Sequence, residues 1–388
     1  MITIILLSLG LFFSCASAEI LNNGTDLDMA PETQKQTSAG VSRASLTTFH
    51  VGWFESRFAG ERTEEIASEG GTIVVPYVGS KGDAKAIETY LDSAAAAGLK
   101  VALQIPGDFV RSGNTEAIGD WVFQFRDHRA VELWYLFDEP EIHGVKPQTL
   151  KTVYRYLKGE GRGLKVAMTF YNPRKAQRDY AGSFDVFWLN YYPVMWGTKE
   201  FFGISIGNFA GRVRAGKRAA ATCGAEFGMI VQAYGTSDKG ENQFNRRLPS
   251  AAELRYMIWA SLKENPSYLL FWSRYRSDQE WLRTVFKPTV DPILELFAPG
   301  TRILTTKGFS ITGGAFDLFH FCTEERGILA VIGGPTTLRN AALKFPRSLR
   351  ASALLIPWGV GARKAEDNTW ILEMPAFGVA LFEIYKES

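Results

Sequence analysis

Two adjacent acids, Asp138 and Glu139, followed by Pro140, are the residues of this chain whose type and spacing point most directly to chemistry. They come directly after residues 131–137, an apolar run rich in aromatic side chains that predicts a buried strand. A carboxyl group at such a strand end can serve as a general acid, the role that cleavage of a glycosidic bond requires. The alternative is structural, with Asp138 capping the next helix and Glu139 in its first turn.

The elements that would position these acids follow a repeating pattern. From residue 48 onward, short apolar runs alternate with stretches typical of helices, the clearest of which covers residues 83–98. The eight runs that we predict as strands are 48–55, 72–78, 100–105, 131–137, 165–171, 184–192, 229–234 and 268–272. This alternation indicates a parallel sheet, and eight units in roughly 250 residues match a (β/α)8 TIM barrel over residues 46–298. An open doubly wound α/β sheet is the alternative, but no glycine-rich phosphate-binding turn follows an early strand.

The pattern changes near Pro299, where β-prone runs follow one another with turn residues and no helix-length segment between them. These runs cover residues 302–305, 315–322, 328–332, 351–356, 370–374 and 379–384. They predict a C-terminal antiparallel β-sandwich domain over residues 299–388. We interpret residues 375–378 as a turn between two paired strands.

The composition excludes several classes of function. A chain of 388 residues with 46% hydrophobic residues can bury a large core, and we expect two domains and a monomer. The net charge of +2 gives no indication of a nucleic-acid partner or of an electrostatic membrane patch. The four histidines lack metal-ligand spacing, so we predict no metal and no other cofactor.

The N-terminus is typical of an export signal. Residues 2–13 are almost wholly apolar but too short to span a bilayer comfortably, and Ala16-Ser17-Ala18 offers a cleavage site. We therefore predict a signal peptide over residues 1–18 and a disordered linker over residues 19–45. An alternative cut would leave Cys15 as a lipid-anchored first residue, in a segment that loosely resembles a bacterial lipobox. Either cut predicts a secreted, periplasmic or cell-surface protein with no transmembrane span.

Residues 46–298 resemble the large superfamily of (β/α)8-barrel glycoside hydrolases. The segments that carry this resemblance are 95–101, 134–140, 190–194 and 231–235, together with 379–384 in the C-terminal part. In retaining members, an Asn-Glu-Pro at the fourth strand carries the acid/base glutamate, so the resemblance implies that role for Glu139, with Asp138 in place of the Asn. Retaining members place a nucleophilic Glu at the end of the seventh strand, whereas this chain has Gln232 there and Glu226 before the predicted strand. The resemblance implies a glycosidase, but not the standard two-glutamate mechanism.

Three mechanisms stay open at this point. In a substrate-assisted mechanism, Glu139 protonates the leaving oxygen and Asp138 orients the substrate's own N-acetyl group, with Tyr192 or Tyr234 donating to the acetamide oxygen. Both acids reach one site only if the strand has ended by Asp138, because neighbouring strand residues face opposite ways. In an inverting mechanism, a second carboxylate roughly 6.5–9.5 Å away activates water. The candidates for that carboxylate are Glu55, Asp108, Glu141 and Asp238. The third possibility is a barrel that binds sugar without cleaving it, as Gln232 at the nucleophile position would allow.

Polar and aromatic residues recur at the predicted strand ends, which indicates a lined pocket. The residues that we predict to bind substrate are Glu55, Tyr77, Gln104, Asn190, Tyr192, Gln232, Tyr234 and Trp272, with Trp272 as the floor of a sugar subsite. Arg246, Arg247, Arg274 and Arg276, in the loops after the last two barrel strands, would recognise an acidic sugar or form a solvated face. We therefore predict a glycoside hydrolase acting on a poly- or oligosaccharide. The alternative is a non-catalytic carbohydrate-binding barrel at the cell surface.

Overall fold

The computed structural model describes residues 49–55, 61–79, 83–196, 205–235, 246–296, 301–304, 306–322, 326–354 and 358–386. The predicted signal peptide (1–18), Cys15 and the predicted linker (19–45) lie outside these ranges. Among the helices within them, none has the length and apolar character needed to cross a bilayer.

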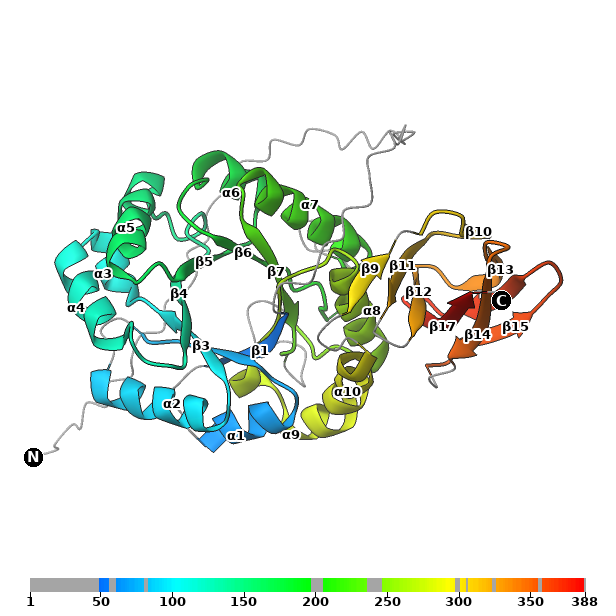
Figure 1. Ribbon diagram of the computed structural model, residues 1–388, viewed down its shortest axis with the longest axis horizontal. Coiled ribbons are helices and arrows are strands. Elements are labelled where there is room, and N and C mark those ends of the chain that lie inside the picture. The colour runs from blue at the N-terminus through cyan, green and yellow to red at the C-terminus, as the bar shows by residue number, and fades with distance from the viewer. Residues whose placement is uncertain are drawn as a thin grey trace, which may run out of the picture. The chain divides into compact units, whose positions relative to one another are not determined.

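Eight parallel strands close into a barrel in the order in which they occur along the chain, and β1 pairs with both β2 and β8 (Figure 1). The strands are β1 (His50–Glu55), β2 (Ile73–Pro76), β3 (Lys100–Gln104), β4 (Val131–Asp138), β5 (Lys165–Phe170), β6 (Val186–Asn190), β7 (Glu226–Gln232) and β8 (Tyr268–Trp272). All eight predicted strands and the (β/α)8 architecture are therefore confirmed. The seventh strand starts earlier than predicted, because Glu226 is its first residue and pairs with Val186.

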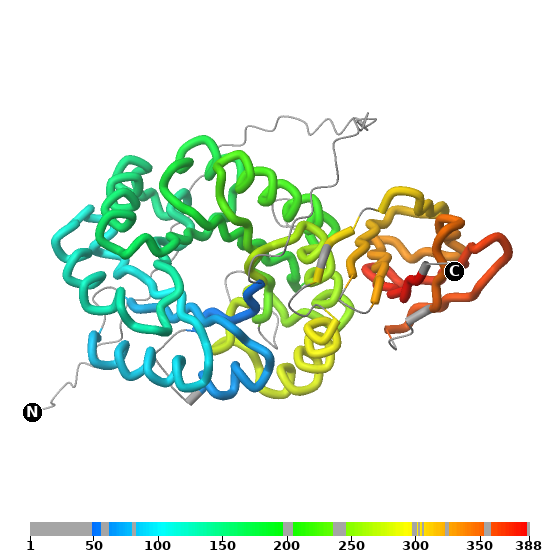
Figure 2. Tube along the Cα trace, viewed as in Figure 1, coloured from blue at the N-terminus to red at the C-terminus, as the bar shows by residue number. Residues whose placement is uncertain are grey.

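Helices follow the strands around the outside of the barrel, as the chain trace shows (Figure 2). They are α1 (Glu61–Ser68), α2 (Ala84–Ala96), α3 (Gly107–Ser112), α4 (Thr115–Phe125), α5 (Pro147–Glu160), α6 (Pro173–Asp179), α7 (Phe209–Thr222), α8 (Ala251–Leu262), α9 (Gln279–Trp281) and α10 (Lys287–Leu296). Local signals set their ends. Asp83 caps α2 by accepting from two backbone N–H groups, and Ser250 and Glu253 form a capping box at the start of α8.

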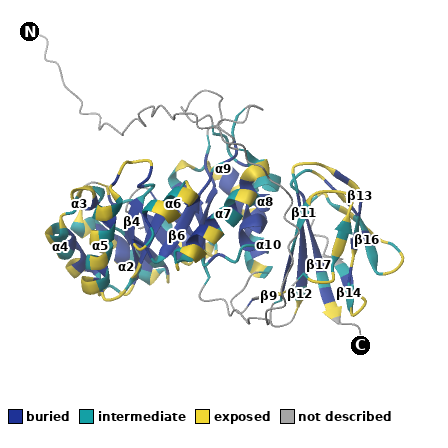
Figure 3. Ribbon diagram, turned by 90° about the horizontal axis from the view of Figure 1, so that it is seen from above, coloured by how far each residue is buried: buried dark blue, intermediate teal, exposed yellow. Residues whose placement is uncertain are grey.

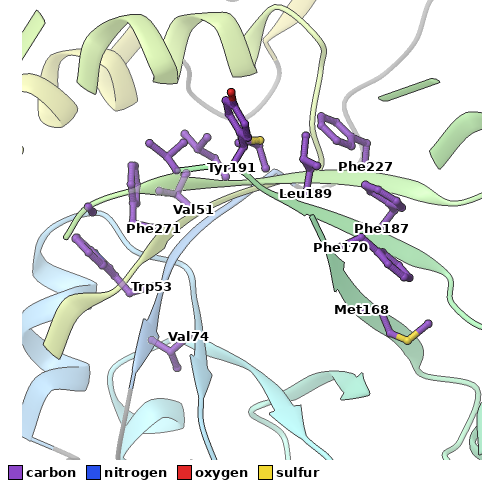
Figure 4. Close-up of a cluster of buried hydrophobic side chains, with 14 of the residues drawn as sticks. Val51, Trp53, Val74, Met168, Phe170, Phe187, Leu189, Tyr191, Phe227 and Phe271 are labelled. Atoms are coloured by element: carbon purple, nitrogen blue, oxygen red, sulfur yellow. The ribbon is translucent and has the colours of Figure 1, made fainter. Parts of the chain in front are cut away.

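The barrel strands separate two layers of apolar side chains. The inner layer fills the barrel and includes Phe54, Tyr135 and Trp188, whose rings pack against one another. The outer layer lies between strands and helices, and Figure 4 shows part of it, including Trp53, Phe170 and Phe187. Burial is therefore concentrated on the strands and on the inward faces of the helices (Figure 3).

The C-terminal part contains two antiparallel sheets, in the orders β10-β13-β16-β15 and β14-β17-β12-β11-β9. Their strands are β9 (Arg302–Leu304), β10 (Ser310–Thr312), β11 (Phe316–Cys322), β12 (Gly327–Gly333), β13 (Leu338–Lys344), β14 (Leu349–Leu354), β15 (Gly361–Lys364), β16 (Thr369–Met374) and β17 (Val379–Lys386). Apolar side chains from both sheets, such as Leu372 and Phe382, form one shared core, which is the packing of a β-sandwich. Three of these strands, β10, β13 and β15, were not predicted from the sequence, because each is short or carries exposed polar residues.

The interpretation of residues 375–378 as a turn between paired strands was wrong. β16 pairs with β13 and β15, whereas β17 pairs with β12 and β14. The turn therefore carries the chain from one sheet to the other. Its β16 and β17 neighbours, Met374 and Ala380, both contribute to the core between the sheets.

Helix α8 gives a stability prediction. Trp259 on this helix is fully buried, and its ring lies 6.3 Å from Phe319 and 5.8 Å from Phe321 in β11. We expect Trp259→Ala to lower the free energy of unfolding by about 3–5 kcal/mol, because it leaves a cavity in this contact. Chemical denaturation measures the change. The control, Phe123→Ala at a position 71% exposed, should change it by no more than about 0.5 kcal/mol. Equal effects of the two substitutions would contradict the packing.

Candidate active site

A skipped residue in the pairing of β4 with β5 decides which way the acids point. Tyr135 pairs with Ala167, but the next pair is Phe137 with Met168, so Leu136 has no partner in the ladder. Leu133 and Tyr135 face the inside of the barrel, whereas Leu136 and Phe137 both belong to the outer layer. The skip restarts the alternation, so that Asp138 faces inward.

Asp138 is held by hydroxyl groups from inside the barrel. The Tyr77 hydroxyl donates to Asp138 Oδ2 over 3.2 Å, and the Trp272 indole Nε1 donates to the Tyr77 oxygen over 3.0 Å. The Tyr135 hydroxyl also bonds to Asp138 and lies 3.0 Å from Thr169 Oγ1. Burial raises the pKa of Asp138, and the two tyrosine hydroxyls oppose that rise by stabilising the carboxylate.

Glu139 turns toward the same site. Its φ of +46° ends the regular strand, and its backbone N–H donates to the Thr169 carbonyl over 3.0 Å. The Asn190 amide Nδ2 donates to Glu139 Oε1. The pKa of Glu139 is raised to about 8, mainly by burial and secondly by the charge of the neighbouring Asp138 carboxyl. A carboxyl with this pKa is protonated at neutral pH and can donate its proton.

An aromatic wall made of Tyr192, Tyr234 and Trp272 stands beside the two acids. Tyr192 stacks on Trp272 with ring centroids 5.4 Å apart, and Tyr234 meets Trp272 edge-on at 4.4 Å. The charges of Asp138 and Glu139 both raise the pKa of the Tyr192 hydroxyl, after the larger effect of burial, so this ring lies close to both carboxyls. One face of Trp272 is covered by Tyr192, and its indole N–H is used by Tyr77, so Trp272 also helps to position Asp138.

Two glutamines that were predicted to bind substrate form hydrogen bonds to backbone groups. Gln232 is fully buried: its Oε1 accepts from Val194 N, and its Nε2 donates to the carbonyls of Val194, Tyr234 and Arg247. Gln104 accepts from Val78 N over 2.8 Å. Gln232 thus connects three segments by hydrogen bonds: the one after β6, the one after β7, and the one that contains Arg247. Neither polar atom of its side-chain amide is left for a ligand.

Of the other candidate carboxylates, Glu141 lies near enough for its charge to raise the pKa of Glu139, after the larger effects of burial and of Asp138. Glu55 shares the outward parity of Val51 and Trp53 and pairs with Arg62 of α1 at 3.2 Å. Burial raises the pKa of Glu55 to about 7. Glu141 accepts the N–H groups of Tyr171 and Asn172, and Asp108 is exposed in the first turn of α3. Asp238 lies outside the residues that the structure describes.

The site thus unites Asp138, Glu139, Tyr77, Asn190, Tyr192, Tyr234 and Trp272. Sequence reasoning missed Tyr135 and Thr169, which bond to each other beside Asp138. Their place inside the barrel follows from strand alternation, but their contact with Asp138 depends on the skipped residue. Within the described residues, no group of three or more His, Cys, Asp or Glu side chains is arranged to hold a metal ion.

The role of Gln232 can be tested by Gln232→Glu. A carboxyl there has no N–H for the three carbonyls, and leaving buried groups unpaired should cost at least about 2 kcal/mol at pH 7. Burial would raise the folded-state pKa of the new carboxyl above its unfolded value of about 4.3, so the variant should lose stability relative to wild type as pH rises above that value. Urea unfolding at pH 4.5 and 7.5 measures this. Gln104→Glu, which keeps its acceptor, is the control, and equal costs in both variants would contradict the assignment.

Comparisons with known proteins agree with the fold. No protein-family model matches the sequence, and no characterised protein matches it by sequence. A family 5 glycoside hydrolase from Bacteroides vulgatus has a similar structure, with a TM-score of 0.57 at 9% identity over 87% of this chain and 89% of that one. An alpha-amylase from Geobacillus thermoleovorans, solved with acarbose, has a TM-score of 0.55 at 9% identity over 89% of this chain and all of that one. An alpha-L-arabinofuranosidase from Thermotoga maritima, solved with arabinose, has a TM-score of 0.54 at 9% identity over 88% and 97%. The chain is thus similar in fold to (β/α)8 glycoside hydrolases.

Proposed function

We propose that the protein hydrolyses glycosidic bonds of a poly- or oligosaccharide, with Glu139 as the proton donor. The observation that carries this proposal is the pair of buried carboxyls, Asp138 and Glu139, at the carboxyl end of a barrel strand and beside an aromatic wall, where burial raises the pKa of Glu139 to about 8. In TIM-barrel enzymes the reaction takes place at this end. The similarity to glycoside hydrolases supports the proposal at the level of the fold. The apolar N-terminal segment and its small-residue cleavage site support action outside the cytoplasm.

The two acids have different environments, which suits different roles. Asp138 receives two tyrosine hydroxyls, whereas Glu139 receives one amide N–H and feels the Asp138 charge. The shared site therefore favours the proton on Glu139 and the negative charge on Asp138. Glu139 donates that proton to the glycosidic oxygen as the bond to the anomeric carbon breaks.

Of the three mechanisms, the substrate-assisted one uses the carboxyls that the structure places together. Asp138 would accept the N–H of a 2-acetamido group, whose carbonyl oxygen attacks the anomeric carbon while Glu139 protonates the leaving oxygen. In this proposal Tyr192, whose hydroxyl forms no hydrogen bond with a described residue, donates to that carbonyl oxygen. Asn190 is 5% exposed, and its Oδ1 has no partner among the described residues, so it can accept a further donor from the sugar.

The first test is hydrolysis of a panel of polysaccharides and aryl glycosides. Glu139→Gln should lower kcat/KM at least about a hundredfold, because it removes the general acid. Wild-type activity should fall as pH rises through about 8, where Glu139 loses its proton. Glu132→Gln is the control, since Glu132 pairs with Lys100 at the opposite end of the barrel. Activity that survives Glu139→Gln would contradict this role. Sugar binding without hydrolysis of any substrate would favour the carbohydrate-binding alternative.

The second test separates the mechanisms with two aryl glycosides that differ only in carrying a 2-acetamido or a 2-hydroxyl group. The wild type should prefer the acetamido substrate, and Asp138→Asn should lower kcat/KM for it at least about a hundredfold, with a smaller loss for the hydroxyl substrate. Equal use of both substrates by the wild type would rule out substrate assistance and favour a mechanism with a second carboxylate, for which Glu141 and Asp238 are the candidates to test next.

A further inference from the structure

The four arginines after the last two barrel strands divide into two structural and two site-facing residues. Arg247 forms a two-pronged ion pair with Glu253 of α8, at 2.8 and 2.6 Å. Arg274 is 2% exposed and pairs with Glu69, and also with Glu65 at 3.1 Å. The guanidinium charges of these two side chains are therefore paired with carboxylates of the chain itself.

Arg246 and Arg276 instead flank Tyr234 of the aromatic wall. Arg246 hydrogen-bonds to Tyr234, and the charges of Arg246 and Arg276 both lower the pKa of that hydroxyl, against the larger effect of burial. The Arg276 guanidinium lies over the Trp272 ring, 5.1 Å from its centroid, and 5.5 Å from that of Tyr275. It is exposed and forms no ion pair with any residue that the structure describes. The charge of Glu139 also acts on Tyr234, so the two cations and the proposed acid share one neighbour.

The backbone beside both arginines is fixed. Arg246 pairs with Met195 in a β-bridge, and Gln232 bonds to the carbonyl of the next residue, Arg247. Gly235 packs so closely on this segment that an added Cβ would lie 2.0 Å from the Arg247 carbonyl carbon. On the other side, Arg276 N donates to Ser273 O over 3.1 Å, and Ser277 Oγ donates to Ala233 O. Side chains on fixed backbone lose less entropy when they bind a ligand.

We infer that Arg246 and Arg276 bind an anionic substituent, a carboxylate or a sulfate ester, on the sugar that occupies the site beside Glu139. The inference rests on the proposed function for the saccharide nature of the ligand. A guanidinium group presents paired N–H donors that match the oxygens of either anion, and stacking on an aromatic ring orients it. Net protein charge is only +2, so the attraction comes from these two placed side chains and not from a general basic surface.

Isothermal titration calorimetry on the full chain carrying Glu139→Gln tests this without turnover. The probes are an oligouronide with its carboxyl-reduced counterpart, and a sulfated oligosaccharide with its desulfated counterpart. At low salt, at least one acidic probe should bind about tenfold more tightly than its neutral counterpart, the scale of a charge-assisted hydrogen bond. Which acidic probe is preferred identifies the anion. The preference should shrink as salt is raised.

Substitution of Arg276 tests whether this side chain causes the preference for acidic probes. Arg276→Gln should reduce it at least about fivefold, and Arg276→Lys should keep part of it because the charge remains. Arg283→Gln is the matched control, an exposed arginine paired with Glu280 away from the wall, and should leave the preference unchanged. Thermal unfolding should show all three variants folded, because both positions are exposed.

Acidic probes that bind no better than their neutral counterparts would overturn the inference, as would equal losses in Arg276→Gln and Arg283→Gln. The outcome is separate from that of the proposed function. Acidic binding through Arg276 without any hydrolysis would contradict the hydrolase and leave the anion site standing. Hydrolysis of neutral glycosides that depends on Glu139, with no preference for acidic probes, would support the hydrolase and contradict the anion site.

Discussion

The skipped residue in the pairing of β4 with β5 is the constraint on which the candidate site depends. Without it, Phe137 would point into the barrel and Asp138 into the layer between strands and helices. With it, Asp138 faces Tyr77 and Tyr135, and Glu139 leaves the strand at a positive φ beside Asn190. Burial and then the neighbouring Asp138 charge raise the pKa of Glu139, which favours a protonated acid at this position.

The rim around this pair is held rigid by side chains that resemble ligand contacts in the sequence. Gln232 uses both polar atoms of its amide on the backbone of neighbouring segments, and Gln104 and Glu141 each use one side-chain oxygen in the same way. This bonding fixes the loops that carry the aromatic wall and Arg246, so the site is largely formed before any ligand arrives. The absence of a carboxylate at position 232 therefore reflects a structural role for that position and does not by itself indicate lost activity.

The barrel could be predicted from the sequence because each strand is an apolar run that ends in polar residues, and burial enforces that pattern. The alternation of side chains along a strand also predicts which way each side chain points. Glu55 lies two and four residues after Trp53 and Val51, which pack outward, so it points outward as well. Three things could not be predicted. The skip at Leu136 depends on the pairing with β5, which is non-local. The partners of Gln232 lie in loops far along the chain. In the β-sandwich, strand pairing is not set by sequence adjacency, so the turn at residues 375–378 joins two sheets.

The most direct test of the account is a crystal structure of the Glu139→Gln variant with an uncleaved oligosaccharide. We expect the side-chain amide at position 139 to lie within hydrogen-bond distance, about 2.6–3.2 Å, of a glycosidic oxygen. We also expect Asp138 to contact the same sugar ring on the side of the anomeric carbon. A sugar bound with its glycosidic oxygens away from position 139, or outside the carboxyl end of the barrel, would contradict the central claim that Asp138 and Glu139 form one catalytic pair.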